Sequence, residues 1–430
     1  MTRLGLIIGV LSLAPAVNAQ TGLPAVDSAA VARAAWRAAA RSESPAATLT
    51  YVTHAARAWP GQPAYWSALA VVAAQASDTA LLTEALELLG GLGAGAEVLG
   101  DSGVVRMSAV PGVGAALRRL REATAERRTG QIIRSSPDST VYAEGIDADS
   151  ASGRFYVASV RHRTVYAVEP DGTWRDLGLS RAPDVGAILG VRVAPGGKQL
   201  WVTTIGLPQM RGYLPADSAL AALLLVRIAD GSIERRWALP ADGSLHVLGD
   251  LTVGPAGDVF VTDSRQPLLF RLRPGADTFS VTRHPLFRSL QGVAATPDGL
   301  FLYMADYSHG LLRQDLRTGE VIHVADAPGT TSLGVDGLVL RGRSLIGVQN
   351  GFAPPRIARF ALSAGGERIS AVEVLDRQPS VADEPTIGTL VPGGFVYVAN
   401  SQWEKYDDAG RRREGTHLAP THLIRISLAP

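Results

Sequence analysis

The chain of 430 residues contains no cysteine, and this absence excludes several kinds of chemistry at once. Disulfide bridges, thiolate nucleophiles, iron–sulfur clusters and zinc–cysteine sites all need the missing side chain. Lysine is almost absent as well, because only Lys198 and Lys405 are lysine among the 41 basic residues, so Schiff-base catalysis has few candidates. The sequence also lacks a Gly-x-Ser-x-Gly nucleophile elbow, a His-Glu-x-x-His motif and a phosphate-binding loop.

The chain has no excess of either charge. Its 41 basic and 40 acidic residues give a formal net charge of +1. A near-neutral protein has no electrostatic reason to bind nucleic acid or an anionic membrane, and we expect neither as its main partner. Beyond the N-terminus, no apolar run approaches the roughly 20 residues that span a bilayer, so we expect no transmembrane span.

The N-terminus has the features of a signal peptide. Arg3 supplies a positive start, residues 4–13 form an uncharged apolar run, and Val17-Asn18-Ala19 is a small-x-small cleavage site. The sequence therefore predicts a signal peptide over residues 1–19 and an exported protein, either periplasmic or secreted. An apolar tail on a cytosolic protein is the alternative interpretation.

Residues 24–130 have the pattern of a helical domain. Alanine-rich runs carry apolar residues at helical spacing, and several of them end at glycine or proline. The pattern predicts helices over residues 29–41, 46–59, 63–76, 79–89 and 114–128. Short connections between them resemble tetratricopeptide-type helical hairpins, although no clean repeat of about 34 residues is present. A small helical bundle is the alternative, and either arrangement offers a surface for a protein partner.

Residues 138–430 contain a repeated β-strand pattern. An aromatic or branched strand centre, often preceded by a Pro-x-Gly-type turn and followed by a small or polar residue, recurs six times. The centres are residues 156, 201, 260, 303, 346 and 397, which are 43 to 59 residues apart. Six strand–turn–strand units at this spacing predict an all-β six-bladed propeller, preceded by the small α-helical domain. Two stacked smaller β domains are the rival interpretation.

One phase of this repeat carries polar residues beside glycines. It lies ten to thirteen positions before each strand centre, where the innermost strand of a blade would begin and face the central channel. Glycine there allows close backbone approach around a crowded axis. The residues at this phase are Glu144-Gly145, Leu189-Gly190, Gly249-Asp250, Gln291-Gly292, Asp336-Gly337 and Glu384-Pro385.

Several carboxylates in one channel cannot all remain charged and unpaired. A cation neutralises them, some stay protonated with a raised pKa, or arginines such as Arg192 pair with them. Oxygen ligands without cysteine suit Ca²⁺. His246 precedes Asp250 by four residues and is a candidate proton carrier, with a turn or surface histidine as the alternative.

A resemblance to a known family rests on three of these segments: Glu144-Gly145, the stretch from Gln291-Gly292 to Pro297-Asp298-Gly299, and Asp336-Gly337-Leu338. They resemble the gluconolactonase, senescence-marker-protein and strictosidine-synthase-like six-bladed propellers over about residues 141–430. The resemblance implies a divalent ion such as Ca²⁺ on the axis, held by a Glu, two Asn and an Asp, and hydrolysis of lactones or organophosphates. It assigns the Glu ligand to Glu144, and the acidic ligand, which is also the candidate base or nucleophile, to Asp336.

Two positions depart from the family pattern. The Asn expected in the fourth blade is Gln291, and the Asn expected in the third blade falls on Gly249, with Asp250 next to it as a candidate replacement. Two hypotheses remain. The first is a Ca²⁺-dependent hydrolase of a small lactone or ester, with Glu144, Asp250, Gln291 and Asp336 as metal ligands and Asp336 and His246 as catalytic residues. The second is a non-catalytic scaffold that binds a protein or glycan.

Overall fold

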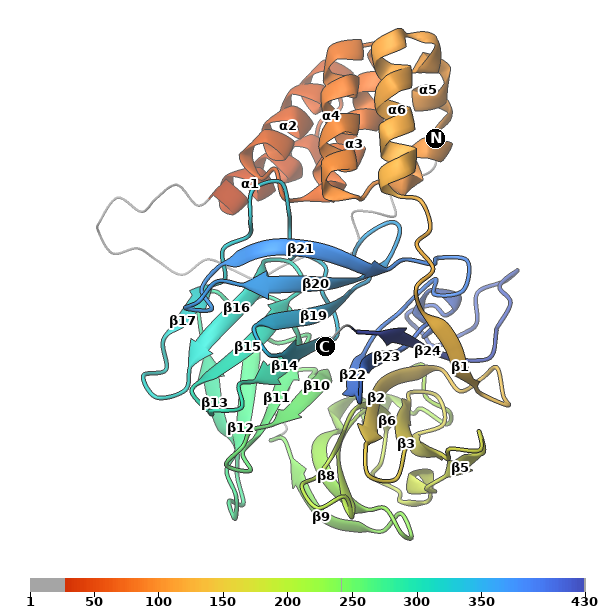
Figure 1. Cartoon of the computed structure of the whole chain (residues 1–430), viewed down its shortest axis with the longest axis vertical. Helices are drawn as coiled ribbons and strands as arrows, with labels where there is room; N and C mark the ends of the chain where they lie inside the picture. The colour runs from red at the N-terminus through yellow and green to blue at the C-terminus, as the bar shows by residue number, and fades with distance from the viewer. Residues whose placement is uncertain (1–27, 241, 429–430) are drawn as a thin grey trace. The chain divides into compact units, whose positions relative to one another are not determined.

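The computed structural model describes residues 28–240 and 242–428, and the chain divides after Thr124 into two compact units. The predicted signal peptide, residues 1–19, lies outside the described residues. The first unit is helical and the second is built of β-strands (Figure 1). None of the described helices combines the length and the apolar character that crossing a membrane requires.

The helical unit contains six α-helices within residues 28–123, and its longer helices pack on one another in chain order, α1 on α2, α2 on α3 and α3 on α4. Asp78 caps α4 by accepting a hydrogen bond from the Leu81 N–H at 3.0 Å. The helices are α1 (Ser28–Ala40), α2 (Pro45–Ala58), α3 (Pro63–Gln75), α4 (Thr79–Leu92), α5 (Ser102–Arg106) and α6 (Pro111–Ala123).

Three predicted helix boundaries were wrong, and one of them is the end of α6, which stops at Ala123 rather than at residue 128. Helix α4 does not stop before Gly90 but continues to Leu92, and Gly93 ends it with φ +64°. A Cβ at Gly90 would lie 3.7 Å from the backbone of Leu120, so this glycine lies where α4 contacts α6 rather than at the end of a helix. Helix α6 begins at Pro111, three residues before the predicted start, because proline suits the first turn of a helix.

The second unit is the predicted six-bladed propeller, made of six four-stranded antiparallel sheets. In blades 1 to 5 the four strands follow one another in sequence. Blades 1 to 3 contain β2 (Ala143–Asp149), β3 (Arg154–Ser159), β4 (Thr164–Val168), β5 (Trp174–Asp176), β6 (Ala187–Val193), β7 (Gln199–Ile205), β8 (Ala221–Arg227), β9 (Ile233–Ala238), β10 (Leu248–Val253), β11 (Val259–Asp263), β12 (Leu268–Leu272) and β13 (Ser280–Arg283). Blades 4 to 6 contain β14 (Leu290–Ala295), β15 (Phe301–Asp306), β16 (Gly310–Asp315), β17 (Val321–His323), β18 (Leu338–Arg341), β19 (Ser344–Gln349), β20 (Arg356–Leu362), β21 (Ile369–Asp376), β22 (Gly388–Val391), β23 (Gly394–Val398), β24 (His422–Ser427) and β1 (Gln131–Ser135).

The ring closes through the last blade, whose strand order is β22, β23, β24 and β1. Strand β1, which precedes residue 138, therefore supplies the outer strand of a blade otherwise formed by the C-terminal end of the chain. Asp376 fixes the segment before β1, because its carboxylate accepts hydrogen bonds from the Thr129 N–H at 2.9 Å and the Tyr397 hydroxyl at 2.6 Å. Closure thus joins residues that are far apart in sequence.

Each pair of neighbouring blades shares a hydrophobic cluster, and six such clusters surround the ring. The cluster between blades 1 and 2, for example, contains Tyr156 from β3, Ile188 from β6 and Leu224 from β8. A single blade would leave these side chains in water, so ring closure is what buries them.

The repeated sequence signal marks the second strand of every blade. Its centres, such as Tyr156 and Phe260, lie in β3, β7, β11, β15, β19 and β23. In blades 3 and 4 the polar residue after the centre accepts hydrogen bonds from the loop that precedes the inner strand of the same blade. The Asp263 carboxylate accepts from the Val247 N–H at 3.0 Å, and the Asp306 carboxylate accepts from the Ser289 N–H at 3.0 Å. These recurring polar residues therefore hold loops in place.

Candidate functional site

The inner strands carry the candidate residues at an irregularity that recurs in the first four blades. The register of β2 against β3 shifts between Ala143 and Ile146, and β6, β10 and β14 shift at the equivalent place. Glu144, Asp250 and Gln291 all lie within these shifts. Because a β-bulge re-aims side chains and is frequent beside functional sites, it explains why these residues leave the regular strand alternation.

Glycines beside these residues let the inner strands of neighbouring blades approach closely. A Cβ at Gly145 would overlap the carbonyl oxygen of Leu189 in the next blade, and one at Gly292 would overlap that of Asp336. The Gly292 N–H donates to this Asp336 carbonyl at 2.7 Å. The expected close backbone approach around the axis is confirmed at both positions.

Glu144 is 7% exposed and is held by the loop that follows β23. The Ser401 hydroxyl and the Trp403 indole N–H both donate to Glu144 Oε2, at 2.9 and 2.6 Å. Burial raises the pKa of the Glu144 carboxyl well above its ordinary value, the charge of Asp336 raises this pKa further, and the two hydrogen bonds oppose the rise. The environment therefore favours the protonated form of Glu144.

Asp336 lies two residues before β18 and is partly exposed. The Asn350 amide donates to Asp336 Oδ2 at 2.8 Å and to the Pro385 carbonyl at 2.9 Å. Burial raises the pKa of Asp336 to about 7, the Asn350 hydrogen bond opposes this rise, and the charge of Asp250 adds to it. A carboxyl that ionises near neutral pH is suited to accept a proton in catalysis.

Asp250 forms an ion pair with Arg192, which is the alternative that the sequence left open. Arg192 Nη2 donates to Asp250 Oδ1 at 3.1 Å, and Asp250 is 1% exposed. Burial raises the pKa of Asp250, whereas the Arg192 charge lowers it. The Val293 N–H also donates to Asp250, at 3.3 Å, so both of its oxygens are engaged by protein donors.

Gln291 is bound by two serines. The Ser264 hydroxyl donates to Gln291 Oε1 at 2.8 Å, and Gln291 Nε2 donates to the Ser289 hydroxyl at 3.3 Å. A Cβ at Gly249, where the family pattern has an Asn, would overlap the Ser264 hydroxyl. The serine therefore fills the space that a side chain at residue 249 would need.

His246 lies beside the loop-binding aspartate of blade 3. Its Nδ1 is 2.6 Å from Asp263 Oδ2, its Nε2 is 3.4 Å from Asp242 Oδ1, and its ring lies edge-on to Phe270 of β12. These contacts place His246 within its own blade, and none of them joins it to Glu144 or Asp336.

Sequence reasoning missed a second set of residues around the axis. They are Ser264, Tyr307, Asn350 and Ser401, and each directly follows a polar residue at or just beyond the end of the second strand of blades 3 to 6. Ser264 binds Gln291, Asn350 binds Asp336, and Ser401 binds Glu144. This position of the repeat, one residue beyond the polar strand end, is the signal that could have identified them.

Tyr307 and Glu384 add further polar groups next to Asp336. A Cβ at Gly351, the neighbour of Asn350, would lie 3.0 Å from the Tyr307 hydroxyl oxygen. Burial and then the charges of Asp336 and Glu384 raise the pKa of Tyr307, so its hydroxyl stays a hydrogen-bond donor. Burial raises the pKa of Glu384 to about 7 as well. Burial thus raises the pKa of several acidic groups around Asp336.

The oxygen atoms available for a cation are few. Within residues 28–240 and 242–428, no three Asp, Glu or His side chains form a metal-binding group. Both hydrogen bonds to Glu144 go to Oε2, the Asn350 bond to Asp336 goes to Oδ2, and the buried Asn350 Oδ1 accepts no hydrogen bond from the described chain. Glu144, Asp336 and Asn350 are therefore the residues whose oxygens suit Ca²⁺, while Asp250 and Gln291 are engaged by protein donors.

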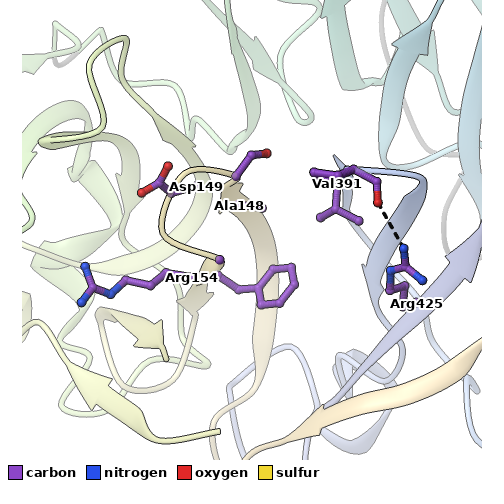
Figure 2. Close-up of a pocket in the computed structure, with 9 residues that line it drawn as sticks. Ala148, Asp149, Arg154, Val391 and Arg425 are labelled. Atoms are coloured by element: carbon purple, nitrogen blue, oxygen red, sulfur yellow. Dashed lines mark hydrogen bonds between the residues drawn. The ribbon is translucent and has the colours of Figure 1, made fainter. Parts of the chain in front are cut away.

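A surface hollow of about 250 Å³ lies elsewhere, between the β2–β3 turn and the β22–β23 turn (Figure 2). Asp149 and Arg154 line it from blade 1, and Val391 and Arg425 line it from blade 6. Asp149 ends β2, whereas Glu144 lies near its start, so the hollow is at the other end of the strand and is separate from the axial carboxyls.

The fold is a six-bladed β-propeller, and acidic side chains lie at or just before the start of several of its inner strands. No protein-family model matches the chain, and no curated protein matches it. Among solved structures, it is similar to virginiamycin B lyase from Staphylococcus aureus, with 15% identity, 63% of this chain and 80% of that chain covered, and a TM-score of 0.45. It is also similar to regucalcin from Agrobacterium tumefaciens, described as a calcium-binding protein, with 17% identity and a TM-score of 0.45. This match covers 69% of this chain and 93% of regucalcin. A luciferin-regenerating enzyme is similar with 12% identity and a TM-score of 0.44. This match covers 67% of this chain and 91% of the enzyme. These values carry no argument about activity, which has to come from the site itself.

Proposed function

We propose that the propeller is an exported hydrolase of a small lactone or ester and that the reaction takes place at the axial carboxyls. The observation that carries this proposal is that protein donors hold one oxygen of Glu144 and one of Asp336, while burial raises the pKa of both carboxyls. Two carboxyls whose environments shift their pKa values can serve as acid and base in one reaction.

In the proposed reaction Asp336 is the general base. Its carboxylate takes a proton from a water molecule, and the water oxygen forms a bond to the carbonyl carbon of the substrate. Protonated Glu144 and the Tyr307 hydroxyl donate hydrogen bonds to the oxyanion that develops. The intermediate then collapses, the carbon–oxygen bond to the leaving group breaks, and the leaving oxygen takes the proton from Asp336. The products are an acid and an alcohol, so the atoms balance.

Calcium is the second part of the proposal, and it comes from the sequence resemblance. Glu144, Asp336 and Asn350 would hold the ion, which would polarise the substrate carbonyl. A bound cation would keep both carboxyls ionised at neutral pH, so calcium and a retained proton on Glu144 are alternative states of the same residues. Removing and restoring the ion distinguishes the calcium-bound state from the protonated state.

A panel of lactones and aryl esters tests the proposal. We expect the wild-type protein to hydrolyse at least one member, with a rate that rises through about pH 7 as Asp336 loses its proton. Activity that survives chelation supports acid–base catalysis without a metal. Activity that chelation removes and Ca²⁺ restores, with a rise in melting temperature, supports the calcium form. No turnover under any condition contradicts the proposed function and favours a scaffold that binds a protein or glycan.

A further inference from the structure

Two loops from blades that are not neighbours meet at one rim of the propeller. One follows β7 in blade 2 and the other follows β23 in blade 6, with blade 1 between them in the ring. We call residues 206–214 and 401–413 the rim clamp. The Gln209 amide donates to the Asp407 carbonyl at 3.1 Å, and a Cβ at Gly410 would overlap the Pro208 carbonyl oxygen. The two loops are therefore in direct contact across blade 1.

Residues of blade 1 and of the segment before it contact both loops of the rim clamp. Arg161 Nη1 donates to the Gln209 carbonyl at 3.1 Å, and the Arg161 guanidinium lies 5.3 Å from the centre of the Tyr406 ring. The Tyr142 ring is stacked on Tyr406 and lies edge-on to Trp403, with 5.0 Å between ring centres in both pairs. This packing gives the clamp one defined position over the inner strand β2.

Tyr142 is a strained residue inside this packing. It is fully buried, and its φ of +49° lies in the left-handed region, which is costly for an aromatic residue. Its hydroxyl has no hydrogen-bond partner among the described residues. Such strain persists only where the surrounding structure enforces it, and it is frequent at functional sites. Tyr142 is two residues before Glu144, so the strain lies beside the proposed catalytic carboxyl.

Two residues of the rim clamp bind the carboxyl of Glu144. The Trp403 indole N–H and the Ser401 hydroxyl both bind Glu144 Oε2, at 2.6 and 2.9 Å. Two donors on one oxygen fix the plane of the carboxyl group and leave Oε1 as the atom that can face a reactant. Neither donor has to touch the substrate to have this effect.

We infer that the rim clamp sets the orientation of Glu144 and that Trp403 is a positioning residue for the hydrolysis, an inference that rests on the proposed function. Trp403 acts through Glu144, so its loss changes the rate of the chemical step rather than substrate affinity. A small misplacement of a catalytic group is costly, because the reacting atoms need a narrow range of geometry.

The substitution Trp403→Phe tests this inference, since it keeps an aromatic ring and removes the N–H donor. We expect kcat to fall about 10- to 100-fold while KM stays within about 2-fold. Trp237→Phe is the matched control, because the Trp237 indole N–H donates to the Ala276 carbonyl at 3.0 Å at a distance from the axis. This control should lose a similar hydrogen bond and keep both kinetic constants.

A second variant loosens the clamp without touching Glu144 or its donors. Gly410→Ala places a Cβ against the Pro208 carbonyl and should lower kcat in the same way as Trp403→Phe. Gly275→Ala is its control, because Gly275 has a similar φ (+76° against +73°) but no atom within 4 Å of an added Cβ.

Active wild-type protein with unchanged kcat in Trp403→Phe overturns the positioning role and leaves the proposed function standing. A fall in kcat with the same fall in Trp237→Phe also overturns it, because the effect would then be general. Wild-type protein that hydrolyses nothing in the panel removes the proposed function, and this inference with it.

Discussion

Asp336→Asn is expected to lower kcat/KM for the hydrolysed lactone or ester by about 10²- to 10⁴-fold, the range that general acid–base catalysis supplies. An amide cannot accept the proton of the attacking water, but it keeps nearly the same shape and can still bind Asn350. Kinetics at pH 8 measure this effect, because Asp336 is then ionised in the wild-type protein.

Stability distinguishes this loss of catalysis from a loss of folding. The pKa of Asp336 is raised to about 7 in the folded protein, so between about pH 4 and pH 7 the folded state holds more protons than the unfolded state. The wild-type protein should therefore lose stability as the pH rises through this window, and Asp336→Asn should not show this contribution. An inactive variant that melts no lower than wild type at pH 8 supports the catalytic role. Unchanged turnover would remove Asp336 from the mechanism.

Arg192→Met is expected to cost the folded protein about 3–5 kcal/mol, the usual effect of leaving one partner of a buried ion pair uncompensated. Asp250 is 1% exposed, and Arg192 is its charged partner at 3.1 Å. Because the Arg192 charge lowers the pKa of Asp250, its removal raises that pKa further. The loss of stability should therefore be larger at pH 8 than at pH 5, as denaturant unfolding would measure.

The double variant Arg192→Met with Asp250→Asn supplies the matching test. Removing both charges should recover most of the lost stability, because no buried charge is then left unpaired. Arg235→Met is the surface control, since the Arg235–Asp277 pair at 2.7 Å is exposed and should contribute less than about 1 kcal/mol. If Arg192→Met lowers the stability of the fold no more than this control does, Arg192 is not needed to compensate the charge of Asp250.

The fold was predictable because ring closure leaves a repeated pattern in the sequence. Every blade has a second strand with an apolar or aromatic centre such as Phe260, often ending in a polar residue such as Asp263, and these strands recur at similar spacing. Strand β1 was not predictable in this way, since it is a single strand without the repeat and pairs with β24 almost 300 residues later. Helix α4 was ended too early because sequence alone does not reveal that Gly90 packs against α6.

The candidate site was predictable only in part, for a related reason. The phase of the repeat gave Glu144 and Asp336, and in the folded protein burial raises the pKa of both. The repeat could not show whether Arg192 or a metal cation would neutralise Asp250, because either one compensates the charge of this carboxylate. Trp403 was missed because it lies in an irregular loop outside the repeated strands, and loop contacts depend on the whole ring.

The proposed chemistry requires an axial carboxyl that ionises near neutral pH, so the decisive measurement is the pKa of Asp336. In chelator-treated protein labelled with ¹³C at aspartate carboxyl carbons, the signal that disappears in Asp336→Asn identifies this residue. If Asp336 is the general base, this signal titrates with a midpoint of about 7. A midpoint near 4, the value of an ordinary exposed aspartate, would contradict it.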